Sequence, residues 1–272
     1  MTAQLGGELM KLKQIFKIAV AALALSFGSI TTAVADLQDI LDSGKVRIGV
    51  PVDVVPFGYV DENNQPAGLD IDLAEMIAEA MGVELEITQI TGINRIPFLT
   101  SNKLDLVISV MGATPERALQ VSFSSPYSAF VLGVFGPESI DVTSPEELGN
   151  YTVGVPRGST QDIELTAMAP NANIMRFEDD ATATAAYLSG QVDLLGTGNP
   201  VAADISKKNP DKAMTTKFVI RVAPTHIAFQ QNNPELGRWL DVFVLYNKVN
   251  GKLDELSRKW LTSDLPDNFP SL

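Results

Sequence analysis

The chain has 272 residues, 45% of them hydrophobic and 19% charged, which is enough to bury a sizeable core in one or two domains. Its net charge of −13 makes it a poor candidate for binding nucleic acid or anionic lipid. The sequence contains no cysteine and a single histidine, His226, so disulfides and a histidine-cluster metal site are excluded. We expect no cofactor, and we interpret His226 as a structural residue.

Residues 1–35 have the order of a secretory signal peptide. A basic stretch, 10–17, precedes a mostly apolar run, 18–30, and Ala33-Val34-Ala35 is a small-x-small cleavage signal. The apolar run is too short for a membrane-spanning helix. We expect cleavage after Ala35 and a soluble periplasmic protein, with Met1 or Met10 as the start; the alternative is an anchored N-terminal helix. Because this segment carries three lysines and one glutamate, its removal changes the net charge to −15.

The chain after residue 35 first alternates short strands with helices. Apolar residues at 69, 73, 76, 77 and 80 indicate a helix that begins at Asp70, and Gly82 ends it. The β-α-β-α-β order predicts a doubly wound parallel sheet. The expected elements are strand 46–50, a short edge at 56–59, a polar hairpin tip at 61–66, helix 70–81, strand 83–90, a helix from 95 to about 102, and strand 106–110.

The same alternation restarts near residue 151. Its last two helices have no strands of their own to cover, so we expect two lobes, with the chain crossing twice and its C-terminus returning to the first lobe. Ligand would bind in the cleft between the lobes. The expected elements are strand 151–155, helix 161–168, strand 174–177, helix 180–190, strand 192–195, strand 218–222, and helices 234–248 and 251–261.

Residues 104–127 lead from a buried strand into the start of a helix. Thr114 is a natural N-cap, Pro115 suits the first helical position, and Glu116 favours the positive helix end. Arg117 adds a fork of donors that matches a carboxylate. Since open α/β sheets bind ligands at the carboxyl ends of their strands, this stretch predicts an anion-binding corner. The alternative is an ordinary capped helix with a surface arginine.

Four motifs resemble those of a known family in their order and spacing. They are Gly68-Leu69-Asp70-Ile71-Asp72-Leu73, Thr114-Pro115-Glu116-Arg117, Phe123-Ser124-Ser125-Pro126-Tyr127 and Gly158-Ser159-Thr160. The family is that of the periplasmic polar amino-acid-binding proteins of ABC transporters, the bacterial extracellular solute-binding proteins of family 3. The resemblance covers essentially the whole chain after residue 35. It implies an α/β, two-lobed type II periplasmic-binding-protein fold, each lobe a doubly wound, mostly parallel sheet, with two hinge crossings.

The resemblance also implies lobe boundaries and ligand contacts. Lobe one would comprise residues 36–128 and 225–272, and lobe two residues 129–224. In the family, the arginine that matches Arg117 holds the ligand's α-carboxylate, and backbone N–H groups that match Ser159 and Thr160 close on the same group. A bidentate guanidinium and a helix N-terminus suit that role physically. The alternative for Ser159 and Thr160 is a capping role alone.

Several family positions differ in this sequence. The family's aspartate for the ligand's α-ammonium corresponds to Gly198, and the neighbouring Asn199 supplies no charge, whereas Asp53 offers a replacement carboxylate. Burying an ammonium without a counter-charge is costly, so the ligand class stays open. Two aromatic positions are Val54 and Gly92. The expected ligand-binding residues are Arg117, Ser159, Thr160, Gly112, Arg95, Asn199, Asp53 and Val110.

Residues 91–97 resemble the T-x-x-N-R-I-P segment of the branch that includes glutamate and aspartate binders. In that branch the arginine helps to bind the acidic ligand, so Arg95 would give the cleft a second guanidinium, which favours a dianionic or strongly polar ligand. The residues before the Pro-Phe turn, Pro51-Val52-Asp53, include no basic residue, and specificity for glutamate stays open. The alternative for Arg95 is a surface residue in a local salt bridge.

The main functional prediction is a non-enzymatic, monomeric solute-binding protein. It would deliver a small polar carboxylate-bearing ligand, an amino acid or a related compound, to an ABC permease in the membrane. One alternative is a lyase like cyclohexadienyl dehydratase on the same fold, with Asp53 as the candidate acid. Another is the ligand-binding module of a sensor, which would need a separate signalling partner.

Overall fold

The computed structural model describes residues 36–265. The predicted signal peptide, 1–35, lies outside the described residues. Among the residues that are described, no helix is long and apolar enough to cross a membrane.

Eight strands form one mixed sheet in the order β5-β1-β6-β11-β7-β10-β8-β9. The pairs β1–β5, β1–β6, β8–β10 and β8–β9 are parallel, whereas β11 and β7 run antiparallel to their neighbours. This arrangement confirms the predicted α/β class. The strands are β1 (Lys45–Val50), β5 (Glu84–Gln89), β6 (Leu106–Val107), β7 (Val121–Gly136), β8 (Thr152–Pro156), β9 (Asn173–Phe177), β10 (Leu194–Gly198) and β11 (Thr215–Gln230), with β2 (Asp53–Val54), β3 (Gly58–Val60) and β4 (Pro66–Ala67) in a small second sheet.

The helices cover the sheet, and five of the nine described α-helices begin at a side-chain cap. Asp36 caps α2 through a capping box, and Gly82 ends α3 in the left-handed conformation at φ 70°. The helices are α2 (Leu37–Ser43), α3 (Leu69–Met81), α4 (Arg95–Thr100), α5 (Pro115–Ala118), α6 (Thr160–Met168), α7 (Asp180–Ser189), α8 (Asn199–Lys208), α9 (Pro234–Val249) and α10 (Lys252–Leu261), with 3₁₀ turns η1 (Gly92–Asn94), η2 (Pro145–Asn150) and η3 (Pro210–Lys212).

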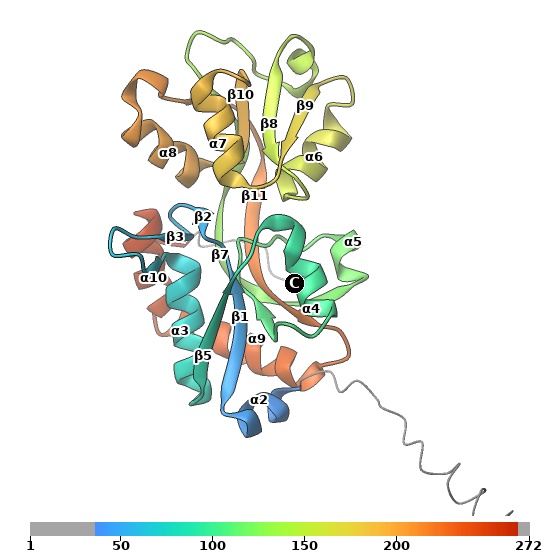
Figure 1. Cartoon of the computed structure of the whole chain (residues 1–272), viewed down its shortest axis with the longest axis vertical. Coiled ribbons are helices and arrows are strands. Elements are labelled where there is room, and N and C mark those ends of the chain that lie inside the picture. Colours follow the sequence, from blue (N-terminus) through green and yellow to red (C-terminus); the bar gives the residue numbers. More distant parts are fainter. Residues whose placement is uncertain (1–35, 266–272) are drawn as a thin grey trace, which may run out of the picture. The chain divides into compact units, whose positions relative to one another are not determined.

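The two long strands, β7 and β11, pass from one lobe to the other (Figure 1). One lobe holds β5, β1 and β6, and the other holds β10, β8 and β9 (Figure 1). Within the crossing, Ser128 pairs with Thr225 and Ala129 with Pro224. The two connections therefore lie side by side, as a two-lobed fold with two hinge crossings requires.

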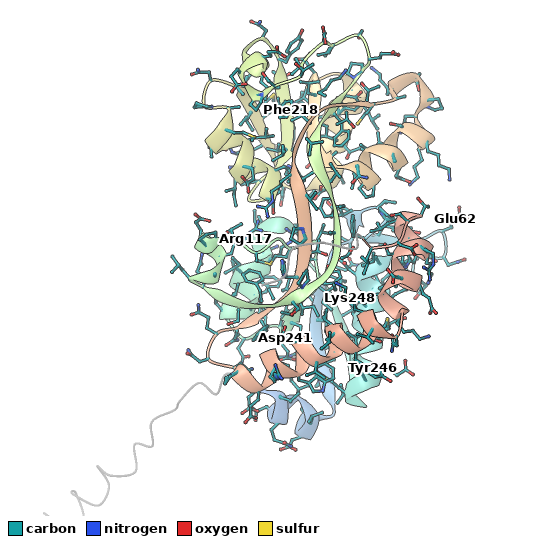
Figure 2. All side chains as sticks on the ribbon, turned by 180° about the vertical axis from the view of Figure 1, so that it is seen from behind. Glu62, Arg117, Phe218, Asp241, Tyr246 and Lys248 are labelled. Carbon is teal, nitrogen blue, oxygen red and sulfur yellow. The ribbon has the colours of Figure 1, made fainter. Side chains whose placement is uncertain are left out.

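The C-terminal helices return to the first lobe, as predicted. Asp241 on α9 accepts hydrogen bonds from the backbone N–H of Ser125 on β7 at 2.7 Å and from its Oγ at 2.9 Å (Figure 2). On α10, Trp260 Nε1 donates to Asp72 of α3 at 2.8 Å. Leu236, Leu240, Phe243 and Val244 of α9 are buried in the core, so this lobe is built from both ends of the described chain.

Several elements differ from the sequence prediction. Helix α2 was not expected, and β11 spans Thr215–Gln230 where only 218–222 was expected. The expected strand 106–110 pairs only over Leu106–Val107, because Val110 turns into the left-handed region at φ 47°. Strand 192–195 is displaced to 194–198, since Asp193 instead accepts hydrogen bonds from Thr152. Helix α8 was not predicted, although Pro200 stands in its first turn, where proline is favoured. Strand β7 was also not predicted, because Pro126 interrupts the strand pattern.

Candidate functional site

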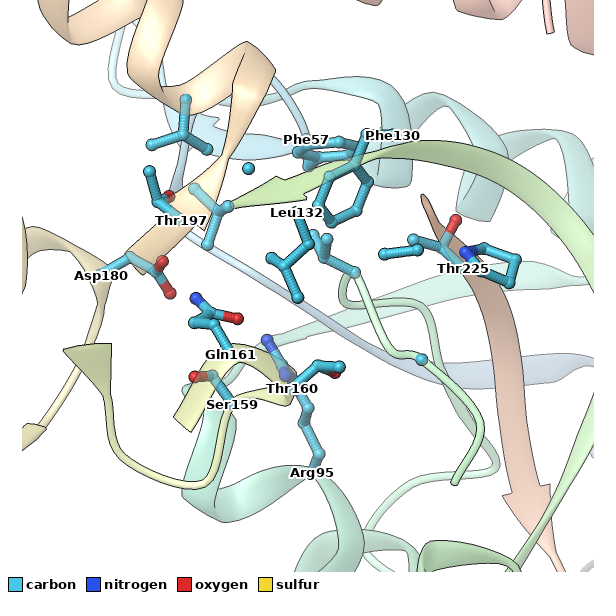
Figure 3. A pocket seen from close by; sticks show the side chains of 17 residues that line it. Phe57, Arg95, Phe130, Leu132, Ser159, Thr160, Gln161, Asp180, Thr197 and Thr225 are labelled. Atoms are coloured by element: carbon cyan, nitrogen blue, oxygen red, sulfur yellow. The ribbon is translucent and has the colours of Figure 1, made fainter. Parts of the chain in front are cut away.

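A cavity of about 40 Å³ lies where the two lobes meet (Figure 3). Arg95, Val110 and Gly112 line it from the first lobe, and Ser159, Thr160, Gln161, Asp180 and Thr197 line it from the second. An apolar wall includes Phe57 and Phe130, whose ring centroids are 5.2 Å apart. The cavity therefore has a polar side and an aromatic side, which is typical of sites that orient small polar ligands.

Arg117 is not among the residues that line the cavity, but it joins the two lobes by contacting Gly112 and Thr160, which do line it. Its Nη1 donates to Gly112 O at 2.7 Å and to Thr160 Oγ1 at 3.1 Å, and its Nη2 donates to Gly158 O at 3.0 Å. Burial, with a smaller effect from the charge of Arg95, lowers the pKa of Arg117 to about 10, so the guanidinium stays charged at neutral pH. Only 6% of the residue is exposed, which contradicts the alternative of a surface arginine.

The helix that carries Arg117 is a single turn, Pro115–Ala118. Thr114 caps it as predicted, accepting a hydrogen bond from the backbone N–H of Arg117. A one-turn helix has little macrodipole. The predicted anion-binding corner therefore depends on the Arg117 side chain rather than on the helix end.

Arg95 lines the cavity and is 7% exposed, so the alternative of a surface residue in a local salt bridge is wrong. Its Nε donates to Ser109 Oγ at 3.1 Å, and no described residue accepts a hydrogen bond from its Nη groups. Burial lowers the pKa of Arg95, while the charges of Asp180, Asp70 and Asp53, in that order, act to raise it. Arg95 is therefore a buried cation surrounded by carboxylates.

The turn that begins α6 caps the helix and also lines the cavity, and its binding of a ligand carboxylate stays a prediction. Ser159 is the N-cap of α6, and its Oγ accepts from the backbone N–H of Asp162 at 3.2 Å. Thr160 Oγ1 accepts from Arg117, and both residues line the cavity. A Cβ on Gly112 would lie 3.2 Å from Thr160 Oγ1, so glycine allows this close approach between the lobes.

Val110 is held in an unfavourable conformation at the cavity wall. A positive φ is rare for a β-branched residue and is characteristic of functional sites. The buried Asp70 accepts from the Val110 N–H at 2.9 Å and from Tyr127 Oη at 2.8 Å. Burial raises the pKa of Asp70 to about 7, although both hydrogen bonds act in the opposite direction.

The side-chain oxygens of Asp53 and Asn199 accept hydrogen bonds from backbone N–H groups of the protein. Asp53 Oδ2 accepts from the backbone N–H groups of Asp180 at 2.9 Å and Ala181 at 3.2 Å, and burial raises the pKa of Asp53. Asn199 Oδ1 accepts from Val131 N at 2.8 Å. Neither residue is among those that line the cavity.

Position 198 is covered by an aromatic ring. Gly198 lines the cavity, and a Cβ there would lie 2.8 Å from Cε2 of Phe130. A side chain at 198 would therefore collide with Phe130. Of the aromatic positions considered from the sequence, Val54 lines the cavity and Gly92 does not, and Phe57 and Phe130 supply the aromatic wall instead.

Asp180 was not identified from the sequence. It is the first residue of α7 and lines the cavity, and burial, with a smaller effect from the charge of Asp53, raises its pKa to about 7. The segment Asp179-Asp180 gives only a helix-start signal in the sequence. Its position at the cleft depends on the way in which α7 meets the first lobe.

A family model for bacterial extracellular solute-binding proteins, family 3, matches residues 46–263. The chain belongs to this family. It is 30% identical over 233 residues to the ABC transporter glutamine-binding protein of Bacillus subtilis, a match that spans 84% of this chain and 85% of the relative.

Solved structures agree with this assignment. The cysteine-binding protein from Campylobacter jejuni has a TM-score of 0.78 and 31% identity, with 86% of this chain and 96% of that protein covered. A mutant of ArgBP from T. maritima has a TM-score of 0.77 and 30% identity, with 84% and 99% covered. The predicted two-lobed type II fold is confirmed by these likenesses. Membership of the glutamate and aspartate branch stays a prediction.

Proposed function

We propose that this protein captures a small polar amino acid, or a related carboxylate-bearing compound, in the cleft between its lobes and delivers it to an ABC permease. Relatives in the family are named as transporter binding proteins for glutamine, arginine and cystine, which supports a carrier over the dehydratase-like alternative. The observation that carries the proposal is Arg117, a charged and buried guanidinium that bridges the lobes beside the cavity.

The ligand carboxylate would bind at the arginine side of the cavity. Support comes from the convergence of Arg95, Ser159, Thr160, Gly112 and Val110 on one cavity. A carboxylate there would meet Arg95 directly and would compete with Gly158 O and Thr160 Oγ1 for Arg117. Asp53 and Asn199 would support the cleft through backbone contacts rather than touch the ligand.

The lobes would have to separate to admit this ligand. Typical ligand pockets measure roughly 300–1,000 Å³, far more than the cavity of about 40 Å³. The lobe boundaries that we propose are 128/129 and 224/225, and the paired residues Ser128 with Thr225 and Ala129 with Pro224 support them. The simplest hinge motion for this fold is a rotation of one lobe relative to the other, with the bend in the two adjacent strands β7 and β11.

Export by a signal peptide also belongs to this proposal. Cleavage after Ala35 would leave Asp36 as the first residue, and Asp36 is the N-cap of α2. Mass spectrometry of the secreted protein should give an N-terminus at Asp36. A retained basic segment would contradict export in this form.

The proposed carrier acts as a monomer. Size-exclusion chromatography with light scattering should therefore give the mass of one chain.

A thermal-shift screen tests the ligand proposal. The purified protein is heated with amino acids, dicarboxylates, amines or keto acids, and a ligand at about 100 Kd should add about 2.7 kcal/mol of stability by mass action. The proposal expects stabilisation by at least one amino acid. A chain that no carboxylate stabilises, or that turns over prephenate, would contradict it.

A further inference from the structure

The cavity between the lobes has an acidic side opposite its arginine side. Figure 3 shows the carboxylate of Asp180 and the guanidinium of Arg95 directed into the same space, with Gln161 between them. Arg95 is 7% exposed, and within the described residues its Nη groups donate to no acceptor. A buried cation with free donors indicates that the polar part of the cavity is built to receive a ligand.

Asp180 is the acidic residue among those that line the cavity. Its backbone N–H donates to Asp53, but among the described residues none donates a hydrogen bond to its carboxylate or forms an ion pair with it. A carboxylate removed from water loses hydration that a cationic partner can replace. The charged groups nearest to it are Asp53 on β2, Arg95 on α4 and its neighbour Asp179.

The other carboxylates near the cavity, and the side-chain amide of Asn199, already have hydrogen-bond partners within the protein. Asp53 accepts two backbone N–H groups of α7, and Asp70 accepts from Tyr127 and from Val110 N. Asn199 accepts from Val131 N, so its carbonyl oxygen is directed to the strand rather than to the cavity. Asp180 is therefore left as the anionic group that a ligand inside the cavity can meet.

We propose that Asp180 is a specificity-determining residue, and that its carboxylate receives a cationic nitrogen group of the ligand. This inference rests on the proposed function, because it assumes that the ligand's carboxylate binds at the arginine side. The cleft then selects ligands that carry both a carboxylate and a cationic nitrogen, and it disfavours carboxylates without an amino group. Dianions are disfavoured as well, because a second carboxylate on the ligand would face the carboxylate of Asp180, which lines the same cavity.

The test measures binding of matched pairs of compounds by calorimetry. The probes are L-glutamine with glutaramic acid, L-arginine with 5-guanidinopentanoic acid, and L-cysteine with 3-mercaptopropanoic acid, each pair differing only in the α-amino group. The full chain is expressed with Asp180→Asn and, as a matched control, with Glu178→Gln. Glu178 is exposed and lies two residues before Asp180, and its change to glutamine removes the same negative charge.

The unmutated protein should prefer at least one amino acid over its partner by about a hundredfold, and Asp180→Asn should reduce that preference about tenfold or more. Glu178→Gln should leave it within about twofold, as expected for an exposed charge. If Asp180→Asn lowers the affinities for L-arginine and 5-guanidinopentanoic acid by the same factor and spares the other two pairs, Asp180 binds the side-chain guanidinium instead of the α-ammonium. Both results support a cation-accepting Asp180.

Unchanged affinities for all six compounds in Asp180→Asn overturn the inference and leave the proposed function intact. If the unmutated protein binds none of the six, the amino acid found in the thermal-shift screen and its analogue without the α-amino group replace them. A protein that no carboxylate stabilises overturns both. Melting curves establish that the variant is folded, and Asp180→Ala serves as a second variant. The unmutated chain gives an independent measurement: the bound amino acid should release protons near pH 7, whereas its partner should not, and equal proton release contradicts the inference.

Discussion

At the scale of single residues, the cleft contains buried charged side chains that differ in how many hydrogen bonds they make to the protein. Arg117 donates three hydrogen bonds to protein oxygens, whereas Arg95 donates one. Arg117 was predictable because its motif and its N-cap are local in the sequence. Asp180 was not, because its neighbours across the cavity are more than 80 positions away along the chain.

Truncation of Arg117 to alanine should weaken ligand binding by about 2–5 kcal/mol, because the carboxylate loses a charged partner and the lobes lose their bridge. Calorimetry with the ligand found in the thermal screen measures this loss. Arg238→Ala, an exposed change on α9, serves as the control and should bind normally. Tight binding by Arg117→Ala would mean that the ligand carboxylate binds elsewhere.

The raised pKa of Asp180, about 7, predicts a pH-dependent stability. Since the ordinary value is 3.8, the unfolded chain holds fewer protons than the folded one between about pH 4 and 7, so this group lowers stability as pH rises through that window. Asp180→Asn should therefore match the unmutated protein near pH 4 and exceed it by about 1–3 kcal/mol at pH 8. Denaturant unfolding at both pH values measures the difference. Equal stabilities at pH 8 would show that Asp180 ionises without penalty.

At the scale of elements, the N-terminus of α7 meets β2 across the cleft. Asp53 on β2 accepts from the backbone N–H groups of Asp180 and Ala181, in the way that a capping side chain satisfies the free N–H groups of a helix. Here the acceptor belongs to the opposite lobe. This contact links ligand-site geometry to lobe closure.

Replacement of Asp53 by alanine should weaken ligand binding by up to about tenfold, because closing the lobes no longer satisfies these two N–H groups. The melting temperature of the ligand-free protein should change little. Glu62→Ala, on the exposed hairpin beside β3, is the control (Figure 2). If Asp53→Ala binds the ligand as tightly as the unmutated protein does, the contact between Asp53 and α7 does not contribute to lobe closure.

The sequence predicted most elements but not those whose pattern depends on tertiary contacts. Helices α3, α6 and α9 were found because each has an apolar face with a cap or a proline at its start or a glycine at its end. Strand β7 was not predicted over any of its 16 residues, since Pro126 is tolerated only where the register with β11 shifts between Thr225 and His226. Helix α8 begins at Asn199-Pro200, which in isolation is typical of a turn.

At the scale of the whole molecule, the two lobes are connected differently along the chain. The segment 129–224 contains β8, β9, β10 and α6, together with the adjoining parts of β7 and β11. The first lobe needs α9 and α10 from beyond residue 233, and Leu236, Leu240 and Phe243 bury themselves in its core. The lobes therefore differ in how much of their core one continuous segment supplies.

This difference predicts different behaviour of the separated segments. Residues 129–224 should fold alone with modest stability, because a separate cluster that includes Val134, Leu148, Val153 and Leu165 lies wholly within them. Residues 36–128 should stay unfolded, since they lack the helices that cover β7. Circular dichroism melting of each segment, with the full chain as the reference, tests this. A cooperative transition in 36–128, or none in 129–224, would contradict the proposed boundaries, because a lobe that is continuous in sequence has to carry its own core.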